Sequence, residues 1–504
     1  MLSDIYHLVQ SLTKAEKRYF RGFASLHTIG EKNSYLKLFE ILNRQKKFDE
    51  PVIRNLFRGQ HLFLLKRHLQ KSIMKSLRTF HTTSSVTIQL QTMISEVEVL
   101  YKKKLLKAAL KLLHHAKKLA LHHEQHLSLV QLLEWEIKLL SSSRQLVRAY
   151  KKIENAFEES SQQLNLYRNF HDCFRFRLSV SAWHHKEIII RKSEEAEVQK
   201  KFLEEINKLS EKNLSGKAQW ELYNGAGTYF STIGYNNKSY AYHKKAALIS
   251  EKKSFLLSDE LRQYLLSLYT KAISYFYLKK YRESLSNLKT IRGVFASLSD
   301  TKNKKNIQEL YFNVLLLEGF ILMDTGKSRN ALPLINELKK QVEIHNTSLN
   351  TSLRTDIYYQ QTVFWFWTGD FKQAQSWVSK LLQDEDVPKE NPARYRFARL
   401  MQLIILLELR EMEQIDNLLP ATRKFLRKKN QLQIEDAVLK FISESTHEEE
   451  NKNKKIIRER FSALKNKIVR IAKNKNEAYA LRVFDYTLWA KAKMENKTIA
   501  EIVK

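Results

Sequence analysis

Apolar residues recur at helical spacing along most of this chain, and residues 358–382 show the pattern most clearly. Before a break at Thr368-Gly369-Asp370, one helical face holds Tyr358, Gln361, Thr362 and Trp365. After the break, a second face holds Phe371, Ala374, Val378 and Leu381. Gly369 suits the turn because a residue without Cβ adopts a left-handed backbone at little cost. The stretch therefore predicts two antiparallel helices that form a hairpin.

The same pattern repeats through residues 90–425. Alignment on Ala374 places small or apolar residues in one column, at Ala109, Ala149, Ser239, Ser284, Ala331 and Ile415. Nine positions earlier stand the large residues Leu100, Leu140, Phe230, Tyr275, Leu322, Trp365 and Leu406. Seven positions later a further packing column holds Ala116, Ala156, Ala246, Ile291, Leu338, Leu381 and Thr422. The columns predict a series of similar hairpins.

Helix breaks are expected five positions before each anchor. These positions are Gly234, Gly326 and Gly369, and otherwise Lys104, Arg144, Lys279 and Arg410. Twelve positions before the anchors, Gly227, Ala272 and Gly319 are small enough to let two helices approach closely. Five of the 11 glycines fall in these two columns, which favours a real repeat over a chance alignment.

These residues resemble the tetratricopeptide repeat, with a glycine at the turn, an aromatic residue two positions later and a small residue in the second helix. The best matches are residues 369–374 and 223–246. Successive anchors are 40, 90, 45, 47, 43 and 41 residues apart, with 90 taken as two units. The standard repeat runs about 34 residues, so longer helices are expected here. The resemblance implies an all-α, right-handed superhelical array of antiparallel hairpins, the long-helix variant of this solenoid.

The two ends of the chain depart from the repeat, which predicts three parts: residues 1–85, 86–430 and 431–504. In the first part, Thr13 and Glu16 form a capping box, and Asp49 caps a helix that starts near Pro51. A longer helix is expected from His61 to Phe80. This basic subdomain suits either a cap on the first repeat or a helix-turn-helix reader of DNA, and the cap is favoured because no base-reading signature is visible. The last part predicts degenerate repeats, a basic helix and a cap that includes a helix from Glu477 to Met494. Within the middle part, a helix is expected from about Leu164 to His185, and residues 301–306 are expected to form a polar loop between repeats.

Composition fits a soluble helical protein. The 504 residues include only 11 Gly and 5 Pro, too few turn residues for many strands. The single cysteine, Cys173, excludes an internal disulfide, and with no apparent signal peptide it favours the cytoplasm. The longest apolar runs are far shorter than the roughly 18 residues of a membrane span, so no membrane insertion is expected.

The net charge of +33 is the most unusual bulk property, and it is uneven. Residues 1–80 hold 16 basic and 6 acidic side chains, and residues 451–475 hold 10 basic and 1 acidic. Two basic patches stand out, namely Arg67, Lys71, Lys75 and Arg78, and Lys465, Lys467 and Arg470. A solvated, lysine-rich surface is the simpler interpretation, and the alternative is that these ends bind RNA, DNA or the ribosome.

The sequence gives little sign of catalysis or of a cofactor. Residues 224–227 pair two glycines without a preceding strand, so helix packing explains them better than phosphate binding. His122 and His126 have a metal-compatible spacing, but no third ligand is evident and Glu124 is misplaced for a metalloprotease. No catalytic residue, cofactor or metal is therefore expected.

If the array coils as tetratricopeptide repeats do, the first helix of each hairpin lines the concave face. Aromatic residues expected on that face are Tyr269, Phe276, Tyr277, Phe320, Tyr359, Phe366 and Trp367. An aromatic groove of this kind suits an extended peptide or a partner helix. The alternative is that these side chains pack between helices. The sequence thus favours a non-enzymatic, protein-binding scaffold or adaptor, with a basic protein associated with nucleic acid or the ribosome as the alternative.

Overall fold

A computed structural model describes most of the chain and contains helices but no strand in the described part. The described residues are 2–26, 34–45, 47–58, 61–81, 85–142, 146–186, 192–252, 261–298, 301–345, 349–428, 431–446, 454–474, 477, 480, 481 and 483–503. Within these ranges, no helix is both long and apolar enough to cross a membrane.

Five helices at the N-terminus pack around a hydrophobic core of their own, centred on Phe20, Leu38 and Ile73. They are α1 (Leu2–Ser11), α2 (Lys14–Leu26), α3 (Ser34–Arg44), α4 (Glu50–Leu56) and α5 (Leu62–His81). Both predicted caps are present. The Thr13 amide donates to Glu16 Oε2 at 2.8 Å, and the Val52 amide donates to Asp49 Oδ1 at 3.2 Å.

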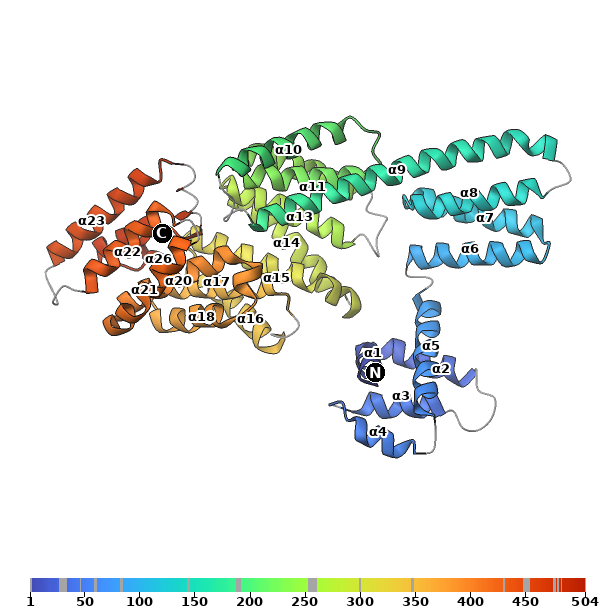
Figure 1. Ribbon diagram of the computed structural model, residues 1–504, viewed down its shortest axis with the longest axis horizontal. Helices are drawn as coiled ribbons and strands as arrows, with labels where there is room; N and C mark the ends of the chain where they lie inside the picture. The colour runs from blue at the N-terminus through green and yellow to red at the C-terminus, as the bar shows by residue number, and fades with distance from the viewer. Residues whose placement is uncertain are drawn as a thin grey trace.

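The next helices form a consecutive series of antiparallel pairs (Figure 1). They are α6 (Val86–Lys102), α7 (Leu106–His122), α8 (His126–Ser141), α9 (Leu146–Lys186), α10 (Lys192–Ser210), α11 (Gly216–Thr232), α12 (Asn236–Lys252), α13 (Leu261–Tyr277), α14 (Tyr281–Ser297), α15 (Thr301–Asp324), α16 (Ser328–His345), α17 (Thr351–Thr368), α18 (Phe371–Gln383), α19 (Val387–Glu390), α20 (Pro392–Leu409) and α21 (Met412–Lys428). The C-terminal part adds α22 (Gln433–Thr446), α23 (Lys454–Ile471), α25 (Tyr486–Glu495) and α26 (Ile499–Ile502).

Each hairpin has a first and a second helix, in chain order. The first helices of successive hairpins contact one another, whereas no comparable contact joins the second helices of successive hairpins in the described part of the chain. The first-helix contacts are α11 with α13, α13 with α15, α15 with α17, α17 with α20, and α20 with α22. In a curved stack, the inner side is the side on which neighbouring units are closest. The first helices therefore line the inner face, and the chain is a tetratricopeptide-like α-solenoid, as the sequence predicted.

Every predicted break that the structure describes adopts a left-handed backbone. The φ angles are 82° at Gly234, 70° at Gly326 and 88° at Gly369. The three non-glycine breaks share this conformation, with φ of 60° at Lys104, 57° at Lys279 and 59° at Arg410. Arg144 lies outside the described residues. The hairpin turns thus keep a left-handed backbone even at lysine and arginine, which adopt it less easily than glycine does.

The anchor column is buried throughout the array. Side chains that are at most 1% exposed include Ala109, Ser239, Ser284, Ala331, Ala374 and Ile415, and Ala149 is 8% exposed. The predicted close approaches are also present at two glycines. A Cβ atom on Gly227 would lie 2.5 Å from the His243 ring, and one on Gly319 would lie 2.7 Å from Gln360 Nε2. The sequence register of the hairpins is therefore confirmed.

Four local predictions were wrong. Residues 301–306, expected as a loop, begin the long helix α15, and a helix expected from Leu164 is the second half of the continuous α9. The last helix, expected from Glu477 to Met494, is interrupted before Asp485, which caps α25. His122 and His126 belong to different helices, because Glu124 between them has a φ of 48° and ends α7. Their spacing therefore does not place them on one helical face.

A charge at an anchor should unfold the hairpins around it. Ala374→Glu or Ala331→Glu would place a carboxylate in a fully buried helix contact, at a cost of about 3–5 kcal/mol in the free energy of unfolding. Urea unfolding followed by circular dichroism would measure this loss. Ser376→Glu, at an exposed position of α18, is the matched control and should change little. Unchanged unfolding of both anchor variants would mean that the register is incorrect.

The left-handed lysine at the α6–α7 turn should be improved by glycine. Lys104→Gly should raise the free energy of unfolding by about 0.5–1 kcal/mol, because glycine adopts positive φ without a Cβ clash. Lys103→Gly should lower it by a similar amount, since Lys103 has an ordinary φ of −82°. Equilibrium denaturation of the two variants compares them directly, and equal shifts for both would contradict the assigned backbone strain.

Candidate functional site

The inner face of helices α13, α15, α17 and α20 is the candidate binding surface, because it gathers the aromatic residues that the sequence singled out. On α13, Tyr277 is 48% exposed, and Tyr269 and Phe276 are half-buried. The Phe276 ring lies 5.6 Å from the Tyr277 ring and 6.0 Å from the Tyr281 ring, measured between centroids. This end of the surface is thus a packed aromatic group with one open edge.

A chain of contacts crosses the inner face from α15 to α20. The half-buried Phe320 ring lies 5.9 Å from the Tyr359 ring. The Arg394 guanidinium lies 3.6 Å from the centre of the same Tyr359 ring, and its Nε donates to Asp356 Oδ1 at 3.2 Å. These contacts fix the side chains of three neighbouring first helices relative to one another.

Two carboxylates on this surface lie close to tyrosines of other helices. Burial raises the pKa of Tyr269 on α13, and the charge of Asp356 on α17 raises it further. Burial also raises the pKa of Asp324 to about 6, although Lys279 and a hydrogen bond from Tyr281 act in the opposite direction. The Asp324 side chain nevertheless remains accessible to solvent.

The C-terminal segment covers the other end of the inner face. The Tyr359 hydroxyl on α17 donates to the Val483 carbonyl. The Phe484 ring lies 5.5 Å from the Phe366 ring and 6.1 Å from the Phe397 ring, so it packs between α17 and α20. Further along, α26 contacts α17, and a Cβ on Gly369 would lie 3.1 Å from Thr498 Cγ2. Residues 483–502 thus form part of the same core.

The C-terminal segment buries some of the aromatic residues that the sequence predicted on one open face, and leaves others accessible. Tyr359, Phe366 and Trp367 are 5%, 3% and 9% exposed and lie in the hydrophobic core. They do not form an open contact surface in this structure, because the chain's own residues already contact that side of α17. Of the other residues expected in the groove, Tyr277 is exposed, and Tyr269, Phe276 and Phe320 are half-buried.

Buried polar contacts that the sequence analysis missed hold the C-terminal segment in place. Glu408 at the end of α20 accepts hydrogen bonds from Trp489 Nε1 at 2.7 Å and from Lys493 Nζ at 2.8 Å. Arg396 and Glu435, both buried, form a bidentate ion pair between α20 and α22. No local pattern marks either contact, because each joins residues that are far apart in the chain.

The basic patch of the N-terminal helices lies along one side of α5. Arg67, Lys71, Lys75 and Arg78 are all exposed there. The Lys75 ammonium lies 5.8 Å from the centre of the Phe23 ring on α2. The patch is therefore a continuous, accessible stripe of positive charge beside an aromatic side chain.

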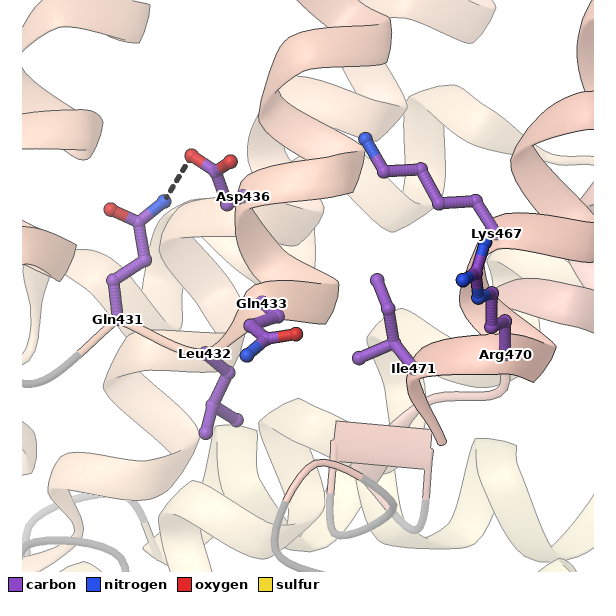
Figure 2. Close-up of a pocket in the computed structure, with 7 residues that line it drawn as sticks. All are labelled: Gln431, Leu432, Gln433, Asp436, Lys467, Arg470 and Ile471. Carbon is purple, nitrogen blue, oxygen red and sulfur yellow. Dashed lines mark hydrogen bonds between the residues drawn. The ribbon is translucent and has the colours of Figure 1, made fainter. Parts of the chain in front are cut away.

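The second basic patch lies on α23 and is partly in a shallow cavity. Lys467 and Arg470 are exposed, and Lys465 is half-buried. Lys467 and Arg470 line a cavity of about 520 Å³ with Gln431, Leu432, Gln433, Asp436 and Ile471 (Figure 2). Asp436 accepts a hydrogen bond from Gln431 at 3.2 Å across the cavity from the two basic residues. The cavity wall thus has one acidic and two basic groups and is not uniformly positive.

No family model and no curated protein matches this chain. Among solved structures, it is similar to the apo form of the quorum sensor NprR from B. thuringiensis, with a TM-score of 0.43 and 13% identity over 72% of this chain and 97% of that chain. It is also similar to NprR in complex with its cognate peptide NprX, with a TM-score of 0.40 and 14% identity over 74% of this chain and 98% of that chain. The architecture described above depends on the contacts of this chain and not on these distant likenesses.

Phe484 should be the side chain on which the C-terminal cover depends most. Phe484→Ala would leave a cavity between α17 and α20 and cost about 3–5 kcal/mol of local stability. Hydrogen exchange should become faster in α17, α20 and α25 and remain unchanged in α6 and α7, because solenoid units contact only their neighbours. Val469→Ala, at a site on α23 that is 49% exposed, is the control. Equal acceleration in all helices would contradict this local role.

Proposed function

We propose that this chain is a non-enzymatic scaffold that binds a protein or peptide on the inner face over α13 and α15. The observation that carries the proposal is the convergence of accessible groups from neighbouring first helices. Tyr277 and Phe276 belong to α13, Phe320 and Asp324 to α15, and Asp356 to α17, three first helices of which α15 contacts both others.

The composition of this surface favours a protein partner. Aromatic side chains provide a large contact area at little cost in conformational entropy, and a few fixed polar groups provide orientation. Asp356 is held by Arg394, and Asp324 interacts with Tyr281, so both carboxylates have defined positions before a partner binds. A preorganised surface of this kind loses less entropy on binding than a mobile one.

The C-terminal cover supports the proposal indirectly. Over α17 and α20, the inner face already binds a polypeptide segment, through aromatic packing around Phe484 and a hydrogen bond from Tyr359 to the Val483 backbone. The region over α13 and α15 has comparable aromatic residues, and we propose that a segment of another protein takes the corresponding place there.

Affinity capture with the full chain tests this function. A combined Tyr277→Ala and Asp324→Asn variant should lose at least about tenfold in the recovery of a specific protein partner, since it removes an exposed ring and a fixed charge. Circular dichroism should stay unchanged. Tyr150→Ala, at a tyrosine of α9 that is 61% exposed, is the matched control and should retain the partner.

Captures with and without nuclease, analysed by mass spectrometry, separate this function from nucleic-acid binding. Recovery that survives nuclease treatment and falls in the double variant supports the inner-face site. Recovery that depends on intact nucleic acid, or that is equal in the double variant and the wild type, would contradict protein binding at the inner-face site.

A further inference from the structure

Helix α2 has a second apolar stripe on the side that faces away from the N-terminal core. Its buried side holds Phe20 and Ala24, both 0% exposed. The opposite side exposes Ala15, Tyr19, Gly22 and Leu26, at spacings of three and four residues. Leu26 is 84% exposed and Tyr19 is 37% exposed. An apolar stripe at helical spacing that no described helix covers is typical of a surface that receives another helix.

This stripe forms one wall of a groove between α2 and α5, which pack against each other in the N-terminal subdomain (Figure 1). The groove encloses about 710 Å³, and Phe23 and Phe80 complete its apolar lining. The Tyr19 and Phe80 rings lie 5.2 Å apart, measured between centroids, so the two helices share this wall. A Cβ added to Gly22 would meet nothing within 4 Å, which leaves room for a partner to approach the backbone of α2.

The rim of the groove is positively charged. Arg18 lines the groove from α2, and Lys75 on α5 lies 5.8 Å from the Phe23 ring. Lys71 and Arg78 are exposed on the same helix. Two glutamates of the N-terminal helices already have partners, since Glu16 Oε1 lies 2.7 Å from His81 Nε2 and Glu40 accepts a hydrogen bond from Arg21 at 2.6 Å. The rim therefore presents a field that favours an acidic partner.

We infer that the α2–α5 groove binds an acidic amphipathic helix of a partner protein. An apolar floor with a positive rim complements a helix that has apolar anchors at i, i+3, i+4 and i+7 and carboxylates on its flanks. Helix α2 has 13 residues and is about 20 Å long, enough to contact three to four turns of such a helix.

A nucleic acid would use this groove less fully. Phosphate groups would interact with Arg18, Lys71 and Lys75, and a base would stack on Tyr19, but the aliphatic Leu26 and the rest of the apolar floor would gain little from the contact. The apolar floor therefore favours the protein ligand. The inference is independent of the inner-face function, because none of its residues belongs to α13 or α15.

Fluorescence anisotropy with labelled 16-residue peptides tests the inference on the full chain. The first peptide has Leu and Phe at i, i+3, i+4 and i+7 and Glu elsewhere. The second replaces Glu by Lys, and the third scrambles the order of the first. The acidic amphipathic peptide should bind saturably and at least about tenfold more tightly than either of the others, because only it matches both the floor and the rim.

Groove variants locate the binding. Leu26→Ser and a combined Arg18→Glu and Lys75→Glu variant should each weaken the acidic peptide by about tenfold or more. The controls are Phe63→Ala and Arg58→Glu, which change an exposed apolar residue and an exposed charge elsewhere. Phe63 lies about 25 Å along α5 from Phe80. Because Leu26 is almost fully exposed, Leu26→Ser should stay folded, which circular dichroism would verify.

Several outcomes would overturn the inference. Equal binding of the scrambled peptide would mean that charge alone acts. A second contrary outcome is tight binding of a 16-nucleotide RNA or a DNA duplex, without peptide binding. If Leu26→Ser leaves that binding unchanged, the basic rim binds phosphate groups and the apolar floor has no part in it. A dimer that Leu26→Ser converts to a monomer, again without peptide binding, would assign the groove to a second copy of the chain.

Discussion

Most hairpins of the array bring two helices together at a small, buried residue. Ala109, Ala331 and Ala374 have no exposed surface, and the facing helix leaves no room for a larger side chain. Where the small residue is Ser284, its hydroxyl donates to the Ala272 carbonyl at 2.8 Å, so the buried polar group is satisfied. The turn position five residues earlier must then reverse the chain tightly, which requires left-handed backbone even at lysine and arginine.

Those requirements are local, and for that reason the sequence could predict them. The anchor and the break lie within one hairpin, so their spacing is visible in the chain as a recurring column. The cover of the inner face is different in kind. Phe484 reaches Phe366 across more than a hundred residues, and nothing near Tyr359, Phe366 or Trp367 indicates that a later segment will pack there. One local signal was available, since Asp485 followed by Thr487 marks a helix cap that the expected continuous helix ignored.

Much of the excess of positive charge lies on the surface, whereas two of the less exposed arginines of the array are paired with carboxylates. Arg396 with Glu435 and Arg354 with Asp384 join neighbouring elements within the array, the second pair at 2.6 Å. A buried ion pair adds little to the free energy of unfolding, because the cost of desolvating both charges offsets their attraction. Its main effect is to favour one packing arrangement of the two elements over others. The basic residues Arg67, Lys71, Lys75 and Arg78 of α5 differ from these pairs because they are exposed.

Helix α9 links the two ends of the array in a way that the other helices do not. Its first half packs with α8, where Gln163 accepts from His126 at 2.7 Å, and its second half packs with α11, where Arg177 pairs with Glu221. With 41 residues it is about 60 Å long, and one residue added between the two halves would turn one half relative to the other by about 100°. The number of residues in α9 therefore sets the orientation of the hairpins before it relative to those after it. For this reason α9 should tolerate an inserted residue far less well than the loops between the other repeats.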